Sequence, residues 1–242
     1  MTSSMTRTAE PLTGVRTSWL HALARDALAL LTGHPPEVRI RVKFLLLSPI
    51  YDGFYRLVPM DPHHEIARRL PPGTRRVLDL CTGTALVPAV LAAESKLFVV
   101  GLDLSPEMLA MGRAKLAHAG RTNAALVRAD ASQLPFRDGS VDAITVSFGL
   151  HELPTAVRER AVQEAARVLR RGGVLVIADL DRPPRFGWLV DAYFRLGEPA
   201  HAREIIGDGL ARLLRAAGFA VEREGPHGAV PMQILTARPS GR

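Results

Sequence analysis

The chain has 242 residues, 47% of them hydrophobic, which is enough for one large α/β domain, alone or with a short helical extension. Its single cysteine, Cys81, excludes a disulfide framework and a thiolate metal site, and it fits a reducing cytoplasm. Residues 1–18 lack the apolar core of a signal peptide, and no apolar run reaches the roughly 18 residues that span a bilayer. The sequence therefore predicts a cytoplasmic protein without a transmembrane segment.

The formal net charge of +7 raises the question of nucleic-acid binding. Arginine is spread along the whole chain, however, and the nearest approach to a cluster is Arg39, Arg41 and Lys43. Aromatic residues, which stack on bases, make up only 5% of the chain. A solvated basic surface is thus favoured over a nucleic-acid partner, and peripheral contact with anionic lipid headgroups is a weaker third interpretation.

The N-terminal quarter differs in pattern from the rest. Residues 1–18 are expected to be disordered, and residues 19–70 are expected to form a helical extension that closes as a lid. Trp19–Leu31 has apolar residues at helical spacing. Val38–Phe44 alternates like a strand, although the unbroken apolar run Leu45–Leu47 favours a helix there. The main domain is expected over residues 71–242.

From residue 75 onward, short β-branched runs alternate with helical patterns, as in a doubly wound parallel sheet. The expected parallel strands are Arg75–Leu80, Leu97–Leu102, Ala124–Arg128, Val141–Ser147 and Val174–Ala178. Three helices are expected between them. The first is Val87–Glu94, and the second begins with Ser105 as its N-cap and Pro106 as its first residue. The third is Thr155–Arg170, which Gly172 and Gly173 should end.

After Asp181 the pattern changes. Pro183 and Pro184 break the chain, and helices are expected over Gly187–Leu196 and Ala202–Ala217, the latter capped by Gly218. Phe219–Glu224 and Met232–Ala237 then form a terminal hairpin. The predicted fold is therefore an α/β, seven-stranded, mostly parallel sheet with an N-terminal helical extension.

The segment from Asp79 to Ala85 links a strand to a helix through a turn of small residues. Such a turn lets a ligand approach the backbone at the carboxyl ends of parallel strands. A dinucleotide would place a phosphate there, but Asp79 would then repel it and the G-x-G-x-x-G spacing is absent. S-adenosylmethionine (SAM) carries an ammonium and a sulfonium and no phosphate, so a carboxylate suits it, directly or through water.

Two further carboxylates end the next two strands. Asp103 is placed to accept hydrogen bonds from ribose hydroxyls, a role common to NAD and SAM sites. Asp130 can accept from an adenine amino group while the Ala131 N–H reaches the ring, and Leu104 and Met108 can contact the ring faces. The alternative, that these aspartates only cap the helices that follow, is less favoured for three successive strand ends than for one.

These residues resemble the class I SAM-dependent methyltransferases over roughly Arg75–Asp181. The branches most alike include the ubiquinone/menaquinone C-methyltransferases and the phospholipid N-methyltransferases. The likeness is carried by VLDLCTGTA (77–85), GLDLSPEML (101–109), ADASQLPFRDGSVDAITVSFGLHELP (129–154) and ARVLRRGGVLVIAD (166–179). The resemblance implies SAM as cofactor, with Asp79, Gly83 and Ser147 at its methionine part, Asp103 at the ribose, and Asp130 and Ala131 at the adenine.

The loop departs from the family pattern at two of three glycine positions, which here hold Cys81 and Ala85. Alanine at 85 is expected to be tolerated, because only the middle position, Gly83, must let the backbone touch the cofactor. Cys81, also in the cofactor-binding set, is expected to tilt the loop slightly, which bears on SAM affinity and leaves the fold unaffected.

His151 follows the fourth strand, where this fold brings acceptor and methyl together. It is a candidate general base with Glu152 orienting it; a polar loop histidine that only shapes the pocket is an equal alternative. We expect no metal site, because His63 and His64 diverge as neighbours on a helix and His201 with Glu204 lacks a third ligand.

The acceptor pocket is expected from the variable segments. Besides His151, candidate lining residues are Tyr51, Tyr55, Phe186 and Tyr193, although each aromatic residue is equally interpreted as core packing. We expect a small apolar or aromatic acceptor such as a quinol, a lipid headgroup or a secondary metabolite, and a monomer or homodimer. The alternatives are a non-catalytic SAM-fold binding protein and, more distantly, a NAD-dependent oxidoreductase.

Overall fold

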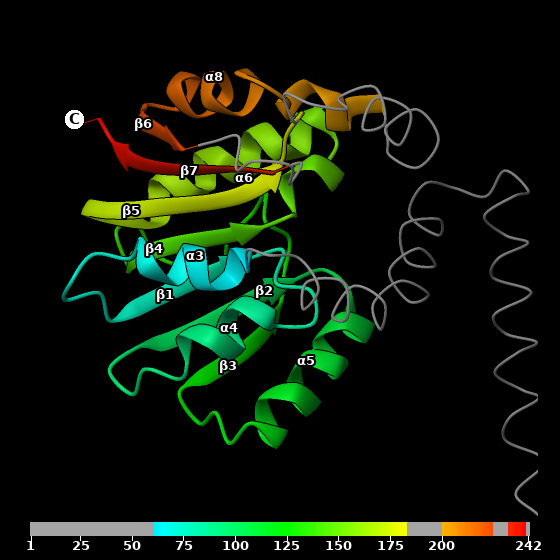
Figure 1. Cartoon of the computed structure of the whole chain (residues 1–242), viewed down its shortest axis with the longest axis vertical. Coiled ribbons are helices and arrows are strands. Elements are labelled where there is room, and N and C mark those ends of the chain that lie inside the picture. Colours follow the sequence, from blue (N-terminus) through cyan, green and yellow to red (C-terminus); the bar gives the residue numbers. More distant parts are fainter. Residues whose placement is uncertain (1–60, 183–199, 225–231, 241–242) are drawn as a thin grey trace, which may run out of the picture. The chain divides into compact units, whose positions relative to one another are not determined.

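Seven strands of the described chain form one sheet, in the order β3-β2-β1-β4-β5-β7-β6 (Figure 1). The computed structural model describes residues 61–182, 200–224 and 232–240. The strands are β1 (Arg76–Leu80), β2 (Phe98–Asp103), β3 (Ala124–Arg128), β4 (Val141–Ser147), β5 (Leu169–Leu180), β6 (Phe219–Glu224) and β7 (Met232–Pro239). Strands β1 to β5 pair in parallel, and β7 runs antiparallel between β5 and β6. The predicted mostly parallel sheet and terminal hairpin are confirmed.

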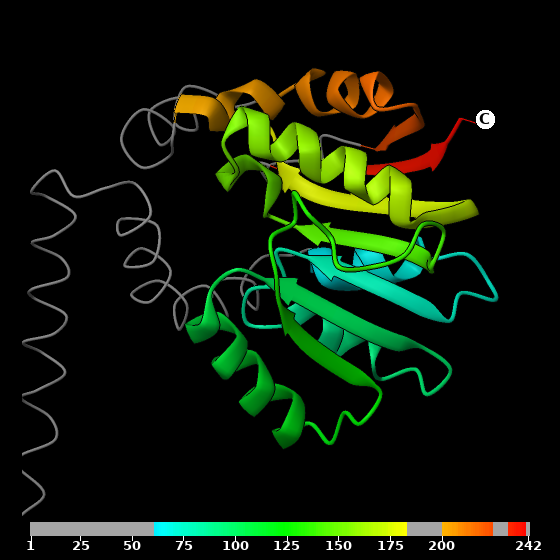
Figure 2. The same cartoon turned by 180° about the vertical axis from the view of Figure 1, so that it is seen from behind.

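Helices cover both faces of this sheet. They are α3 (Pro62–Arg68), α4 (Leu86–Leu91), α5 (Pro106–His118), α6 (Thr155–Val168) and α8 (Gly209–Ala216), with short 3₁₀ turns η1 (Leu150–Glu152) and η2 (Ala200–Ile205). Helices α3 and α4 lie on the face seen in Figure 1, and α6 and α8 lie on the face seen in Figure 2. Neighbouring residues of one strand therefore enter opposite cores, as Val77 and Leu78 do.

The helix after β2 begins as its sequence predicts. Ser105 adopts extended backbone, its hydroxyl accepts a hydrogen bond from the Met108 N–H at 3.2 Å, and Pro106 is the first helical residue. Gly112 faces Leu126 of β3 on one side, where an added Cβ would come within 2.8 Å of a Leu126 methyl carbon. The small residue thus lets α5 lie close to the sheet.

Helix α6 ends earlier than predicted. It stops at Val168, and Leu169 already pairs with Val141 as the first residue of β5, so Gly172 and Gly173 lie in a strand and do not cap the helix. Long-range contacts decide the ending: Arg170 Nε donates to Asp142 Oδ1 at 2.8 Å. The prediction of a helix to Arg170 was wrong because these contacts favour extended backbone.

The helix predicted over Ala202–Ala217 is also divided. Gly207 has a φ of +61°, and its N–H donates to the Asp181 carboxylate at 3.0 Å, so the chain turns between η2 and α8. Gly218 has a φ of +86° after α8, as expected of a helix-ending glycine.

Helix α3 falls within residues 19–70, which the sequence assigns to a helical extension. Its Ile66 is fully buried among Val77, Val87 and Val99 of the sheet core. Residues 1–60 and the expected helix Gly187–Leu196 lie outside the described residues. Within the described ranges no helix is long and apolar enough to cross a bilayer.

Candidate cofactor and acceptor site

The loop between β1 and α4 contains three residues in the left-handed region. Cys81, Gly83 and Ala85 have φ values of +54°, +53° and +60°. All three positions therefore favour glycine, and that only Gly83 must let the backbone touch the cofactor stays a prediction. A non-glycine residue in this region costs on the order of 1–2 kcal/mol. Within the loop, the Thr82 N–H donates to the Leu102 carbonyl at 2.9 Å and the Ala85 N–H to the Thr82 carbonyl at 2.9 Å.

Glycines on neighbouring elements make room for the two side chains that replace loop glycines. A Cβ on Gly112 of α5 would lie 3.0 Å from the Ala85 Cβ. A Cβ on Gly149, after β4, would lie 2.4 Å from the Cys81 Cβ, which is closer than real atoms approach. The turn after β4 thus packs directly on the loop between β1 and α4.

Asp79 lies inside the sheet and not at its open edge. Its side chain is 1% exposed, and its two oxygens accept hydrogen bonds from the hydroxyls of Thr82 and Thr145, each at 2.6 Å. Burial raises the pKa of Asp79 to about 7, against the two hydroxyl hydrogen bonds and with help from the charge of Asp103. Neither threonine was singled out from the sequence. Thr145 could have been, because a hydroxyl within the apolar run of β4 needs a polar partner on a neighbouring strand.

Asp103 connects the end of β2 to the loop. One carboxylate oxygen accepts from the Gly83 N–H at 2.8 Å and the other from the Ser105 N–H at 2.9 Å. Burial raises the pKa of Asp103, although these backbone hydrogen bonds favour the charged form. The structure therefore brings together two residues, 20 positions apart, that the sequence assigned to one site.

The remaining residues expected near the cofactor lie along the same edge of the sheet. Asp130 is exposed and accepts from the Ser132 N–H and hydroxyl, both at 2.8 Å, as a turn aspartate does. Ala131 and Met108 are buried, whereas Leu104 is 63% exposed. The pairing of β2 with β3 brings the end of β3 beside Asp103, whose backbone carbonyl accepts from the Ala129 N–H at 3.2 Å. Contacts to adenine remain a prediction for all four.

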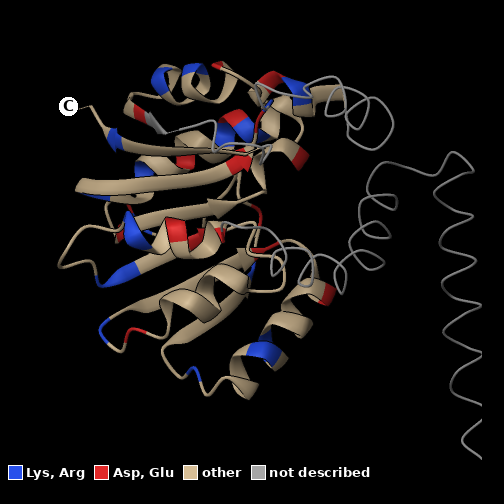
Figure 3. Ribbon diagram, in the orientation of Figure 1, with Lys and Arg blue, Asp and Glu red and all other residues tan. Residues whose placement is uncertain are grey.

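The edge is acidic although the whole chain is basic. Burial raises the pKa of the Cys81 thiol well above its ordinary value, and four negative charges add to this, those of Asp103, Asp79, Asp179 and Glu152. Acidic residues lie at the carboxyl ends of the central strands, on the right in Figure 3. At the end of β4, the buried Ser147 hydroxyl has no hydrogen-bond partner among the described residues. An acidic rim and a free hydroxyl fit a ligand that carries an ammonium and a sulfonium.

His151 is fully enclosed beside this rim. Its Nδ1 lies 2.6 Å from Asp179 Oδ1, and its Nε2 lies 3.4 Å from Glu152 Oε1. Asp179, at the end of β5, is thus the close partner of the ring, where the sequence had suggested Glu152. The signal for Asp179 was its position, a carboxylate directly after the apolar run Val174–Ala178.

A buried arginine fastens the turn that holds His151. Arg158 of α6 is 2% exposed, donates to the carbonyls of Leu150, Leu153 and His201 at 3.1–3.5 Å, and pairs with the Glu204 carboxylate. No pattern in the sequence indicated this role. Arg158 therefore ties η1 to η2 across a gap of over forty residues in the chain.

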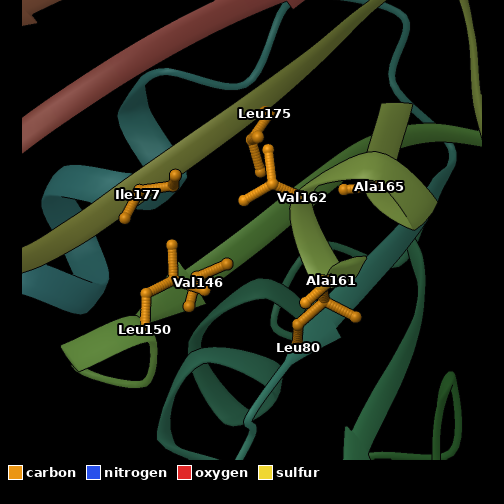
Figure 4. A pocket seen from close by; sticks show the side chains of 8 residues that line it. All are labelled: Leu80, Val146, Leu150, Ala161, Val162, Ala165, Leu175 and Ile177. Atoms are coloured by element: carbon orange, nitrogen blue, oxygen red, sulfur yellow. The ribbon is translucent and has the colours of Figure 1, made fainter. Parts of the chain in front are cut away.

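An apolar gap lies between the sheet and α6. Figure 4 shows the eight side chains that line it: Leu80, Val146, Leu150, Ala161, Val162, Ala165, Leu175 and Ile177. None is polar, so the gap belongs to core packing and cannot recognise a nucleoside. In the part of the chain that the structure describes, no three His, Cys, Asp or Glu side chains are grouped to hold a metal ion. The expected pocket residues Tyr51, Tyr55, Phe186 and Tyr193 lie outside it.

Comparisons with known proteins agree with this geometry. A family model for a methyltransferase domain matches residues 77–173. The demethylmenaquinone methyltransferase of Listeria monocytogenes serotype 4a (strain HCC23) is 34% identical over 177 residues, which cover 69% of this chain and 73% of that protein. The ubiquinone/menaquinone biosynthesis C-methyltransferase of Geobacter sp. (strain M21) is 35% identical over 168 residues, with 64% and 70% covered.

Solved structures share the fold at lower identity. The crystal structure of the 4+2 cyclase SpnF is similar with a TM-score of 0.60 at 23% identity, covering 74% of this chain and 80% of that one. The seven-stranded sheet, the loop after β1 and these relatives lead to one conclusion. The chain belongs to the family of class I S-adenosylmethionine-dependent methyltransferases.

Proposed function

We propose that this protein transfers a methyl group from SAM to a small apolar or aromatic acceptor, with a reduced quinone as the first candidate. The acceptor class is supported by the names of two relatives, a demethylmenaquinone methyltransferase and a ubiquinone/menaquinone C-methyltransferase. A lipid headgroup and a secondary metabolite are the other acceptors to be tested.

The observation that carries the proposal is the hydrogen bond from the Gly83 N–H to the Asp103 carboxylate. It lies in the loop after β1, where three residues have left-handed backbone and acidic side chains are close by. When bound, SAM supplies an electrophilic methyl carbon on a sulfonium. Asp79 would hold its ammonium, directly or through water, while Gly83, Cys81 and Ser147 line the methionine part. Asp103 would accept from the ribose hydroxyls.

The adenine would lie at the edge formed by the ends of β2 and β3. Asp130 would accept from the amino group, the Ala131 N–H would donate to the ring, and Leu104 and Met108 would contact its faces. Leu104 supports this assignment because it is among the few large hydrophobic side chains exposed in the described chain.

The acceptor would lie at the ends of β4 and β5. His151 and Asp179 provide a buried, charged group there, and Arg158 holds the turn that carries it. A site that excludes water strengthens the electrostatic interactions of such a group. Holding the acceptor, the methyl carbon and the sulfur in line supplies much of the acceleration in methyl transfer. Tyr51, Tyr55, Phe186 and Tyr193 remain the predicted apolar walls. A cytoplasmic location and a monomer or homodimer also remain predictions.

A second function deserves a test because one protein of this fold is a cyclase. The chain would then bind SAM or a similar ligand and act on, or recruit, another molecule without methylating it.

The experiment is methyl transfer from radiolabelled SAM to a panel containing a demethylated naphthoquinol, a phospholipid headgroup and small phenols. Calorimetry with SAM, S-adenosylhomocysteine and NAD is run beside it. We expect SAM binding and label in the quinol. SAM binding without label in any acceptor favours the second function, and the absence of SAM binding at millimolar concentration overturns both.

A further inference from the structure

The Asp179 carboxylate is surrounded by N–H donors. One oxygen accepts from His151 Nδ1 at 2.6 Å and from the Leu180 N–H at 2.8 Å; the other accepts from the N–H groups of Leu150 and His151 at 3.0 and 3.3 Å. The side chain is fully buried. All of these partners are N–H groups, so the Asp179 carboxylate acts only as an acceptor here.

This arrangement decides which ring nitrogen carries a proton. An ionised carboxylate can only accept, so Nδ1 of His151 must be the protonated nitrogen. Nε2 then faces the second carboxylate, Glu152, at 3.4 Å. A ring with one carboxylate at each nitrogen is favoured in its doubly protonated, positively charged form.

The balance of effects on the ring agrees with the geometry. Burial lowers the pKa of His151, but the charge and hydrogen bond of Asp179, together with Glu152, outweigh it and raise that pKa to about 10. Other titratable groups also face this region: His201 of η2, whose Nε2 lies 3.2 Å from the Glu152 carbonyl, Arg158 of α6, and Cys81 of the loop.

A charged imidazole has no lone pair with which to take a proton, which bears on the base hypothesis for His151. We propose that Asp179, with Glu152 at the other ring nitrogen, keeps His151 as an imidazolium during methyl transfer, so that His151 does not accept the proton of the acceptor. Asp179 is then a positioning residue that acts through His151. This inference rests on the proposed methyltransferase function.

The proposal fixes where the proton goes. For a quinol acceptor, the hydroxyl proton is released to water and not to His151. The new bond joins the methyl carbon to a ring carbon of the acceptor as the carbon–sulfur bond breaks. The proton on that ring carbon then leaves to water, and the methylated quinol, left as its anion, takes back one proton from water. His151 carries the same charge before and after the reaction.

The alternative role of Asp179 is structural, because it also caps η1 through two backbone N–H groups. Asp179→Asn separates the two roles, since the amide oxygen still accepts these N–H groups while the charge is lost. Asp181→Asn is the matched control: Asp181 lies two residues further along the chain, is 2% exposed, and accepts from the N–H groups of Gly207 and Arg182 at 3.0 and 2.8 Å.

The test combines ¹⁵N-histidine NMR titration with pH profiles of kcat, using the full chain. In the wild type and Asp181→Asn we expect His151 to stay doubly protonated to about pH 9, and we expect the two proteins to share the same pH profile of kcat. In Asp179→Asn we expect a neutral ring at pH 7.5, kcat lowered roughly 10- to 100-fold, partial recovery near pH 6, and a KM for SAM within about threefold.

A neutral His151 at pH 7 in the wild type overturns the proposal. This readout needs no turnover, and the His151 signal among the eight histidines is identified by its loss in His151→Gln. An Asp179→Asn protein that only loses stability, with an unchanged profile per folded molecule, leaves Asp179 structural. Failure of the wild type to methylate any acceptor overturns the proposed function, while the titration still reports the charge of His151.

Discussion

The backbone N–H of Gly83 donates a hydrogen bond to the Asp103 carboxylate at 2.8 Å, joining the loop after β1 to the end of β2. The same carboxylate accepts from Ser105 at 2.9 Å, so it fixes the loop and the start of α5 together. A ribose that hydrogen bonds to Asp103 would therefore meet a group already oriented by the protein.

Replacing Asp103 with Ala should weaken SAM binding roughly 10- to 100-fold, because each hydrogen bond to a charged group contributes about 1.5–3 kcal/mol. Calorimetry with S-adenosylhomocysteine measures this. Asp142→Ala is the control, since Asp142 accepts from the N–H groups of Arg75 and Arg76 at the opposite end of the strands. We expect that variant to be less stable with unchanged affinity; equal losses of affinity would contradict the assignment.

Asp79 gives a prediction for the pH dependence of stability. Its pKa is about 7 in the folded chain against 3.8 ordinarily, so the folded state binds the proton more tightly. The stabilisation from this proton is complete below about pH 4 and is lost as the pH rises through about 7. Asp79→Asn should remove this loss and be more stable than the wild type at pH 8, by on the order of a few kcal/mol.

Urea denaturation of both proteins between pH 4 and pH 8 measures the difference. Curves that run parallel across this range would show that Asp79 does not titrate there. If Asp79 also holds the ammonium of SAM, the stabilised variant should bind SAM more weakly, and wild-type binding near pH 7 should release a proton.

The strands and the start of α5 could be predicted from the sequence because their signals are local. Apolar runs of five or six residues mark buried parallel strands, and Ser105 followed by Pro106 marks a helix start. Three strand-end aspartates likewise predicted the edge at which we propose the site, since parallel strands end at one edge of a sheet.

Side-chain partners and helix ends depended on contacts that sequence distance conceals. The end of α6 and the break before α8 follow from Asp142 with Arg170 and from Asp181 with Gly207. The partner of His151 lies 28 residues away on β5, whereas its neighbour Glu152 looked closer in the sequence. The left-handed backbone at Cys81 and Ala85 was indicated only by their place at two glycine positions of the family pattern, since neither residue type marks such a conformation by itself.

Gly83→Ala should impair SAM binding more than stability. The φ of +53° makes alanine cost on the order of 1 kcal/mol, while its methyl group would occupy the surface that the cofactor approaches. Gly120→Ala is matched, with a φ of +63° and, like Gly83, no described atom within 4 Å of an added Cβ, but it follows α5 away from the loop. Similar stability losses with a selective loss of affinity in Gly83→Ala are expected; unchanged affinity would remove Gly83 from the site.

Arg158→Met should destabilise the chain by about 2–4 kcal/mol, because buried carbonyls of η1 and η2 lose their donor while the apolar stem is kept. Glu204→Gln should cost under about 1 kcal/mol, since the Glu204 side chain is 50% exposed. Urea midpoints of the two variants test this asymmetry.

Because Arg158 holds the turn of His151, its variant should also lower kcat at pH 7.5, measured where the protein is still folded. Equal, small effects of both substitutions would mean that η1 is held by Asp179 alone, through its hydrogen bonds to Leu150 and His151.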